Sequence, residues 1–285
     1  METIYLNPGN LAYWQKKARP SVMALGFFDG IHIGHREVIQ TAFQKAKEAN
    51  LCLSVMSFFP HPKTVISNGK TQIDYLMPLS DKAGILCELG VDIFYIVEFD
   101  KEFSTLSPEI FTAKYLVDLS VVHAVAGFDY TYGSRGMGNM DRLKADSGGI
   151  LEITKVDKVE CRGEKISSTC IREKLARGEV EQLLEFLGRP YEVACIWEGT
   201  SLKVKPHYTL PAAGRYAVTL KGNGQSHMIE IMVTNDKQLI PVSPQTFIAS
   251  ECKGEVSIIW NQLISERIPD YYLERNWMQG LVKTS

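Results

Sequence analysis

Short, continuously apolar runs recur through the first two thirds of this 285-residue chain, and segments with helical periodicity separate them. Strands that are apolar on both faces are expected where helices cover both sides of a parallel sheet. We therefore expect an α/β fold with a parallel sheet and right-handed crossovers. The expected strands are 22–25, 51–58, 91–97, 121–126 and 150–156, and the expected helices are 35–49, 80–89, 107–118 and 169–187.

The pattern changes after Tyr191, where short runs rich in β-branched and aromatic residues alternate with turn residues. This sequence pattern predicts an antiparallel all-β module, followed by a C-terminal helix near 270–280. Gly188-Arg189-Pro190 ends the preceding helix, so we expect domains at 1–187 and 191–285. The expected strands of the second domain are 193–197, 216–220, 228–233 and 254–260.

Charge and composition exclude several classes of function. The chain has 31 basic and 33 acidic residues, a net charge of −2, which does not favour nucleic acid as a partner. The sequence contains no CxxC pair and no Cys/His cluster, so it does not predict a structural zinc site. The dispersed single cysteines suit a reducing compartment. No signal peptide or membrane-spanning stretch is evident, so we expect a cytoplasmic protein without a membrane partner.

Two histidines follow the first expected strand within a glycine-containing loop. Residues 25–35 read Leu-Gly-Phe-Phe-Asp-Gly-Ile-His-Ile-Gly-His and lead into a helical pattern. His32 and His35 lie about one turn apart at the helix start, where free backbone N–H groups favour anions. The two imidazoles could bind the phosphates of a nucleoside triphosphate and stabilise charge as the α-phosphate is attacked. Gly34 would let phosphates approach the backbone.

Asp29 lies in the same loop and allows two interpretations. Its carboxylate could orient a ligand group or a Mg²⁺ ion, or it could cap the loop through the backbone. Taken alone, the whole segment fits a polar loop with a helix cap as well as it fits a phosphate site.

A second cluster of donors lies at 166–172, which reads Ile-Ser-Ser-Thr-Cys-Ile-Arg. The hydroxyls of Ser167, Ser168 and Thr169 and the guanidinium of Arg172 could form a second phosphate cradle. Alone, this segment is better explained as a helix N-cap. Beside the two histidines a phosphate site is favoured, because phosphate transfer needs donors on both sides of the phosphate chain.

Aromatic residues mark two further loops. Phe58-Phe59-Pro60-His61-Pro62 follows the second expected strand, where the prolines fix an extended loop and the rings could line a pocket for a planar ligand. Alone, a stiff loop at the strand end explains it better. Residues 127–133 read Gly-Phe-Asp-Tyr-Thr-Tyr-Gly, in which Asp129 could hold a ribose hydroxyl or a metal, and Tyr130 and Tyr132 could pack on a base. The alternative is an exposed aromatic turn.

These four segments, in this order, resemble the bacterial riboflavin kinase/FMN adenylyltransferase family, the prokaryotic FAD synthetases. The resemblance covers roughly residues 1–190. It implies a Rossmann-like nucleotidyltransferase domain of the HxGH type at 1–187, followed by a small antiparallel β-barrel of riboflavin-kinase type at 191–285. It also implies that ATP and FMN are converted to FAD and pyrophosphate with Mg²⁺, and that the partners are these small molecules.

The resemblance assigns roles to residues of the four segments. The catalytic residues would be His32, His35 and Arg172. The ATP-binding residues would be Gly26, Phe27, Phe28, Asp29, Gly34, Asp129, Tyr132, Gly133, Ser167, Ser168 and Thr169. The FMN-binding residues would be Phe59, Pro60, His61, Pro62 and Tyr130. No metal ligand is assigned.

One departure from the family concerns the second domain. The family's kinase signature is a glycine-rich stretch leading to Pro-Thr-Ala-Asn, whose Thr and Asn serve Mg²⁺ and ATP. The corresponding region, 196–216, is shortened and holds no Pro-Thr pair, and no asparagine occurs between Asn139 and Asn223. We therefore expect a kinase-like barrel without kinase activity.

Two alternatives remain open. The first is an adenylyl- or cytidylyltransferase that acts on another phosphate-bearing acceptor. The second is a non-catalytic regulator that binds a flavin or a nucleotide.

Overall fold

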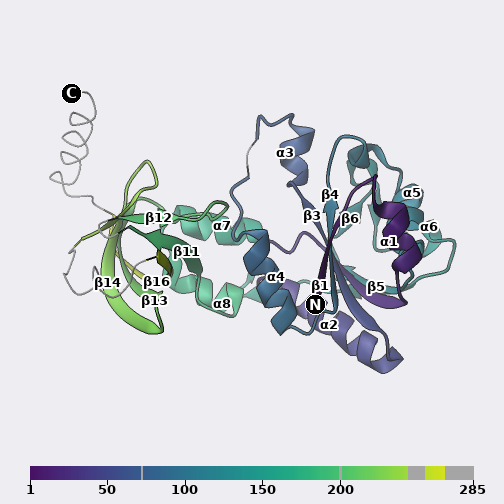
Figure 1. The fold of residues 1–285 in the computed structure, drawn as a ribbon, viewed down its shortest axis with the longest axis horizontal. Coiled ribbons are helices and arrows are strands. Elements are labelled where there is room, and N and C mark those ends of the chain that lie inside the picture. Colours follow the sequence, from purple (N-terminus) through teal and green to yellow (C-terminus); the bar gives the residue numbers. More distant parts are fainter. Residues whose placement is uncertain (72, 199–200, 243–253, 267–285) are drawn as a thin grey trace. The chain divides into compact units, whose positions relative to one another are not determined.

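The computed structural model describes residues 1–71, 73–198, 201–242 and 254–266 of the chain. The chain divides into two compact units, Met1–Ile166 and Ser167–Ser285. The first unit contains a six-stranded sheet and the second a closed barrel, as Figure 1 shows. No helix within the described residues is long and apolar enough to cross a lipid bilayer.

All neighbouring strands of the six-stranded sheet are parallel, which confirms the expected α/β class. The strand order is β1-β4-β3-β2-β5-β8. All five expected strands form, and the sequence missed the edge strand β1, in which only alternate residues are buried. The strands are β1 Glu2–Leu6, β2 Ser21–Leu25, β3 Cys52–Phe59, β4 Ile93–Glu98, β5 Val121–Gly127 and β8 Glu152–Val156.

Helices cover both faces of this sheet (Figure 1). Helix α2 buries a stripe that includes Val38, Ile39 and Ala42, as its apolar periodicity predicts. The opposite face, reached by Met23 and Leu25 of β2, packs in one hydrophobic cluster against helical residues that include Leu11, Phe111 and Leu143. The helices are α1 Leu11–Lys17, α2 Ile33–Ala49, α3 Pro62–Ile66, α4 Leu79–Glu88, α5 Pro108–Thr112 with the π-helical turn η2 Ala113–Val117, and α6 Leu143–Asp146.

Short elements complete the first unit, in the loops that follow the strands. They are the 3₁₀ turns η1 Phe103–Thr105 and η3 Ser134–Gly136, and the strand pairs β6 Thr131–Tyr132 with β7 Gly138–Asn139 and β9 Glu160–Cys161 with β10 Glu164–Lys165.

The second unit begins with a helical segment that is interrupted near Gly178. Gly178 has a φ of +76°, and a Cβ added there would lie 2.8 Å from Oη of Tyr216. The elements are α7 Ser168–Ala176, the 3₁₀ turn η4 Val180–Gln182 and α8 Leu183–Leu187. Leu175 of α7 accepts a 2.8 Å backbone hydrogen bond from Ala212, so this segment belongs to the compact unit that contains the barrel. The position near 188–191 marks the change from helix to strand inside that unit.

The barrel is closed and antiparallel, with the order β11-β12-β15-β14-β13-β16. Alternate residues such as Val193, Cys195 and Trp197 point inward and are buried. The barrel confirms the expected antiparallel all-β module. The sequence missed β12 and β15, each only three residues long, and the helix expected near 270–280 lies outside the described residues. The strands are β11 Glu192–Trp197, β12 Leu202–Val204, β13 Gly214–Gly222, β14 Gln225–Val233, β15 Leu239–Pro241 and β16 Gly254–Ser265.

Candidate nucleotide-binding site

The loop between β2 and α2 is tightly folded around a buried phenylalanine. Phe28 has a φ of +53° and is 1% exposed, and its ring lies edge-on to His35. Gly26 leaves space for this ring, because an added Cβ would lie 2.9 Å from it. Phe28 therefore supports the loop from beneath.

The two histidines stack on one another at the start of α2. Their ring centroids are 3.6 Å apart, with an angle of 16° between the planes. His32 is the N-cap residue, and its Nδ1 accepts a 3.2 Å hydrogen bond from the backbone N–H of His35. A neutral ring that accepts at Nδ1 carries its proton on Nε2. His32 thus combines the role of a cap with that of a fixed Nε2–H donor, so the two interpretations of this segment are compatible.

Burial keeps both imidazoles neutral at pH 7. It lowers the pKa of His32 to about 4, opposed by the carboxylate of Asp129 and assisted by the ammonium of Lys165. Burial, His32 and Lys82 together hold the pKa of His35 well below its usual range. Both rings therefore have the neutral form in which one ring nitrogen is an N–H donor.

Gly34 and Asp29 shape the same loop. A Cβ on Gly34 would lie 3.3 Å from the ring of His32 and 3.8 Å from the carbonyl oxygen of Ile166, so the glycine permits a close approach. Asp29 is fully buried, and its two oxygens accept the backbone N–H of Leu76 at 3.0 and 3.1 Å. The structure thus gives Asp29 the role of a loop anchor.

A buried lysine that the sequence analysis missed contacts this loop near its start. Nζ of Lys82 donates to the carbonyl oxygen of Phe27 at 2.8 Å and lies 3.3 Å from Oγ of Ser57. Lys82 is 1% exposed, and burial lowers its pKa to about 8 against the opposing charge of Asp29. Its position four residues before Leu86 places it on the apolar stripe of α4, and this spacing was the available signal.

Aromatic side chains gather where β3 ends. The ring of Phe27 contacts that of His61, with centroids 4.5 Å apart, and Tyr75 contacts both Phe27 and Phe59. The backbone N–H of His61 donates to Oη of Tyr75 at 2.9 Å, and Pro62 begins α3. The structure therefore brings Phe27, Phe59 and His61 together, and adds Tyr75.

The loop after β5 carries three of the expected binding residues. One of them is exposed, and the other two pack in the interior. Asp129 is exposed and pairs with Lys165 at 2.5 Å. Tyr132 is 5% exposed, and its Oη donates to Asp146 at 2.5 Å. Tyr130 stacks on Tyr132, and burial raises its pKa.

Gly133 closes this loop against α5. It has a φ of +71°, and an added Cβ would lie 2.8 Å from the backbone nitrogen of Pro108. Tyr132 and Gly133 therefore have packing roles, whereas Asp129 has a free approach from solvent.

The hydroxyl motif lies at the start of α7, in the second compact unit. Oγ of Ser167 accepts the backbone N–H of Cys170 at 3.1 Å, which confirms the N-cap. Ser168, Thr169 and Arg172 occupy the first turns of this helix. Their expected contact with phosphate remains a prediction.

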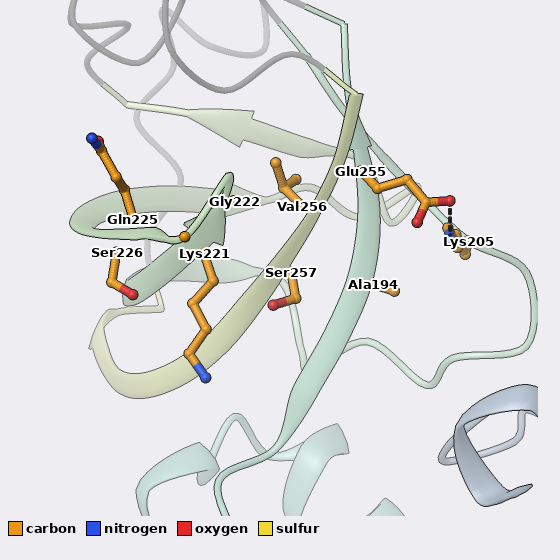
Figure 2. Close-up of a pocket in the computed structure, with 10 residues that line it drawn as sticks. Ala194, Lys205, Lys221, Gly222, Gln225, Ser226, Glu255, Val256 and Ser257 are labelled. Atoms are coloured by element: carbon orange, nitrogen blue, oxygen red, sulfur yellow. Dashed lines mark hydrogen bonds and ion pairs between the residues drawn. The ribbon is translucent and has the colours of Figure 1, made fainter. Parts of the chain in front are cut away.

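Residues of the barrel, among them Ala194, Lys221 and Ser257, line a hollow of about 500 Å³. Figure 2 shows the side chains around it. Two lysines line it, and each has a carboxylate partner. Lys205 pairs with Glu255 at 2.7 Å, and Lys221 lies 3.7 Å from Glu192. The hollow therefore has no surplus positive charge with which to attract a triphosphate.

A family model and several relatives are similar to this chain in sequence. The FAD synthetase family model matches residues 14–170. A bifunctional riboflavin kinase/FMN adenylyltransferase of Listeria monocytogenes is 43% identical over 241 residues, which cover 80% of this chain and 76% of the relative. An FAD synthetase of the same species is 32% identical over 206 residues, which cover 70% of this chain and 82% of the relative.

The fold as a whole is also found in a solved structure. A crystal structure described as a macrolide-efflux protein from Streptococcus pneumoniae aligns with a TM-score of 0.79 and 25% identity, over 99% of this chain and 98% of the other. The family model covers more than half of the chain, and the first relative is more than 30% identical over most of both proteins. The chain belongs to the FAD synthetase family.

Proposed function

We propose that this protein is an FMN adenylyltransferase, which joins ATP and FMN into FAD and releases pyrophosphate. The observation that carries the proposal is the stacked pair of neutral imidazoles, His32 and His35, at the N-terminus of α2. Membership of the FAD synthetase family and a relative named FMN adenylyltransferase support the choice of FMN as the acceptor.

The chemistry needs positioning and charge stabilisation more than it needs a protein nucleophile. A phosphate oxygen of FMN attacks the α-phosphorus of ATP and forms a new P–O bond. The bond from that phosphorus to the oxygen bridging the α- and β-phosphates breaks, and pyrophosphate leaves with the electron pair. Donors placed around the α-phosphate stabilise the charge that develops in this in-line displacement.

The phosphate-binding roles fall to residues at two helix starts. Nε2–H of His32 is free to donate because its Nδ1 already accepts a bond from the backbone. His35 stands in the same stack, and Gly34 keeps the backbone between them accessible. We assign Ser167, Ser168, Thr169 and Arg172 to the phosphates because they begin α7, a nine-residue helix, and the start of a helix together with hydroxyl and guanidinium donors suits an anion.

The flavin would lie on the aromatic side of the first unit. Phe27, Phe59, His61 and Tyr75 form a cluster of rings beside the loop that carries the histidines. Offset and edge contacts with such rings suit a planar ring system like that of FMN. Pro60 and Pro62 restrict the backbone of this segment. We propose that Tyr130 also contacts the flavin.

Mg²⁺ would be held chiefly by the nucleotide. No group of three metal-binding side chains lies together among the described residues. Mg²⁺ is commonly bound by substrate phosphates and water with only one or two carboxylates, so the residues present fit an ion that arrives with ATP. Bound there, it would supply positive charge to the phosphates.

We propose that the barrel has no kinase activity, since the region 196–216 lacks the Pro-Thr-Ala-Asn signature. The functional domains would then be 1–187 and 191–285. We also propose a cytoplasmic location, which five free thiols among the described cysteines support. Small molecules, rather than nucleic acid, would be the partners.

A direct assay tests both proposals. The purified full-length protein is incubated with ATP, Mg²⁺ and either FMN or riboflavin, and the flavins are separated by chromatography. We expect FAD from FMN and no FMN from riboflavin. A lack of FAD would overturn the proposed transfer, whereas phosphorylation of riboflavin would overturn the loss of kinase activity.

A further inference from the structure

Lys165 lies at the end of the β9–β10 hairpin and contacts the loop that follows β5. Its Nζ donates to Oδ2 of Asp129 at 2.5 Å and lies 4.7 Å from the ring centroid of Phe128. The side chains of Lys165 and Asp129 are 43% and 57% exposed, so this ion pair contributes little to stability. A role in folding therefore does not account for it.

The ion pair between Lys165 and Asp129 lies beside the loop between β2 and α2, which carries His32. Leu25 at the end of β2 pairs in register with Ala126 near the end of β5, so the loops that follow these strands start side by side. Ile166, directly after Lys165, places its carbonyl oxygen 3.8 Å from where a Cβ on Gly34 would lie. The charges of Asp129 and Lys165 also act on His32 with opposite sign.

A lone carboxylate at this position would hinder the proposed reaction. ATP has several negative charges on its phosphates, and like charges that lie close together repel one another. Asp129 is nonetheless placed where the nucleotide is expected. Lys165 is the cation that offsets it, and its ammonium group has three donors, of which Asp129 occupies one.

We propose that Lys165 is a nucleotide-binding residue that bridges Asp129 and the phosphates of ATP. Its Nζ keeps its bond to Asp129 and directs a second N–H to a phosphate oxygen. In this way it makes the carboxylate compatible with a polyanionic substrate. The inference rests on the proposed use of ATP at this site.

The test is a double-mutant cycle on the full-length protein with Lys165→Met, Asp129→Asn and the combined variant. We expect Lys165→Met to raise KM for ATP about tenfold or more, with a smaller change in kcat, as loss of a charge-assisted bond predicts. Asp129→Asn should then lower KM for ATP by a factor about five times larger in the Lys165→Met background than in the wild type. Lys165→Arg should keep most of the affinity.

Lys158→Met is the matched control, because Lys158 is an exposed lysine beside the same hairpin and pairs with Glu160 at 2.6 Å. It should leave KM for ATP unchanged. An unchanged KM in Lys165→Met, or effects of the two substitutions that simply multiply, would overturn the inference. Calorimetry with a non-hydrolysable ATP analogue tests the role of Lys165 independently of whether FMN is the acceptor. Weaker binding of the analogue by Lys165→Met supports the inference even if no FAD forms.

Discussion

Nζ of Lys82 lies 2.8 Å from the carbonyl oxygen of Phe27, so a buried ammonium group holds the loop that carries both histidines. Oγ of Ser57 donates to the same carbonyl at 2.8 Å. A lysine is seldom fully buried unless its charge has partners. Its position beneath the loop indicates that the loop geometry depends on it.

Replacing Lys82 by methionine tests this dependence. The substitution removes a desolvated charge while keeping the side-chain volume, so the free energy of unfolding should change by only about 1 kcal/mol. FAD formation should fall about tenfold, because Phe27 retains only the hydroxyl of Ser57 as a side-chain partner. Urea unfolding and flavin chromatography measure the two effects. Lys45→Met, at an exposed lysine of α2, serves as the control, and equal activity of both variants would contradict the role of Lys82.

Removing either histidine side chain should slow FAD formation strongly. We expect His32→Ala and His35→Ala each to lower kcat by about two orders of magnitude, the usual scale for a donor to a developing charge. His32→Asn separates capping from chemistry, because an asparagine oxygen can still accept the N–H of His35. At pH 7 this variant should unfold like the wild type yet remain as slow as His32→Ala. Wild-type turnover in His32→Asn would show that His32 acts only as a cap.

The lowered pKa of His32 makes stability depend on pH with a defined sign. Its pKa is about 4 in the folded protein, below the ordinary value of 6.5 that applies when the chain unfolds. Between these values the unfolded state binds the extra proton, so stability falls as the pH drops from 6.5 toward 4 and is unaffected above 6.5. The full effect is roughly 3 kcal/mol. Urea unfolding of the wild type and of His32→Asn across this range measures it as the difference between the two curves.

Gly133 should not tolerate a side chain. A Cβ there would meet the backbone of Pro108 at 2.8 Å, and the φ of +71° adds strain. We expect Gly133→Ala to lower the free energy of unfolding by about 3 kcal/mol. Gly148 has a similar φ of +65° with nothing within 4 Å of an added Cβ, so Gly148→Ala should cost only about 1 kcal/mol. Similar losses for both variants, measured by urea unfolding, would rule out the clash with Pro108.

Much of the first unit could be predicted because its strands are apolar on both faces. The run ending at Leu25 and the run ending at Ala126 each identify a buried strand, and their carboxyl ends then locate the loops of the site. Strand β1 was missed because only Ile4 and Leu6 of it are buried, and such a short alternation is weak evidence for a strand. The three-residue strands of the barrel were missed because a strand of three residues is too short to show an alternating pattern.

The supporting residues of the site were harder to predict than the residues that we propose to bind the ligand. Lys82 lies four residues before Leu86 on α4, but this spacing is weak evidence for burial because lysine side chains are mostly exposed. Tyr75 is separated from His61 by 14 positions, so their hydrogen bond leaves no local pattern. Asp29 stands beside the phosphate motif, yet its partner is Leu76, far along the chain.

The capping bond from His35 to His32 has a consequence for how the protein handles each substrate molecule. An imidazole that rotates freely must be aligned anew every time a ligand binds, and the lost entropy weakens binding. Here the ring of His32 is aligned when α2 forms, since the helix start requires that same rotamer. The side-chain conformational entropy of His32 is therefore lost once, during folding, and not again each time a substrate binds.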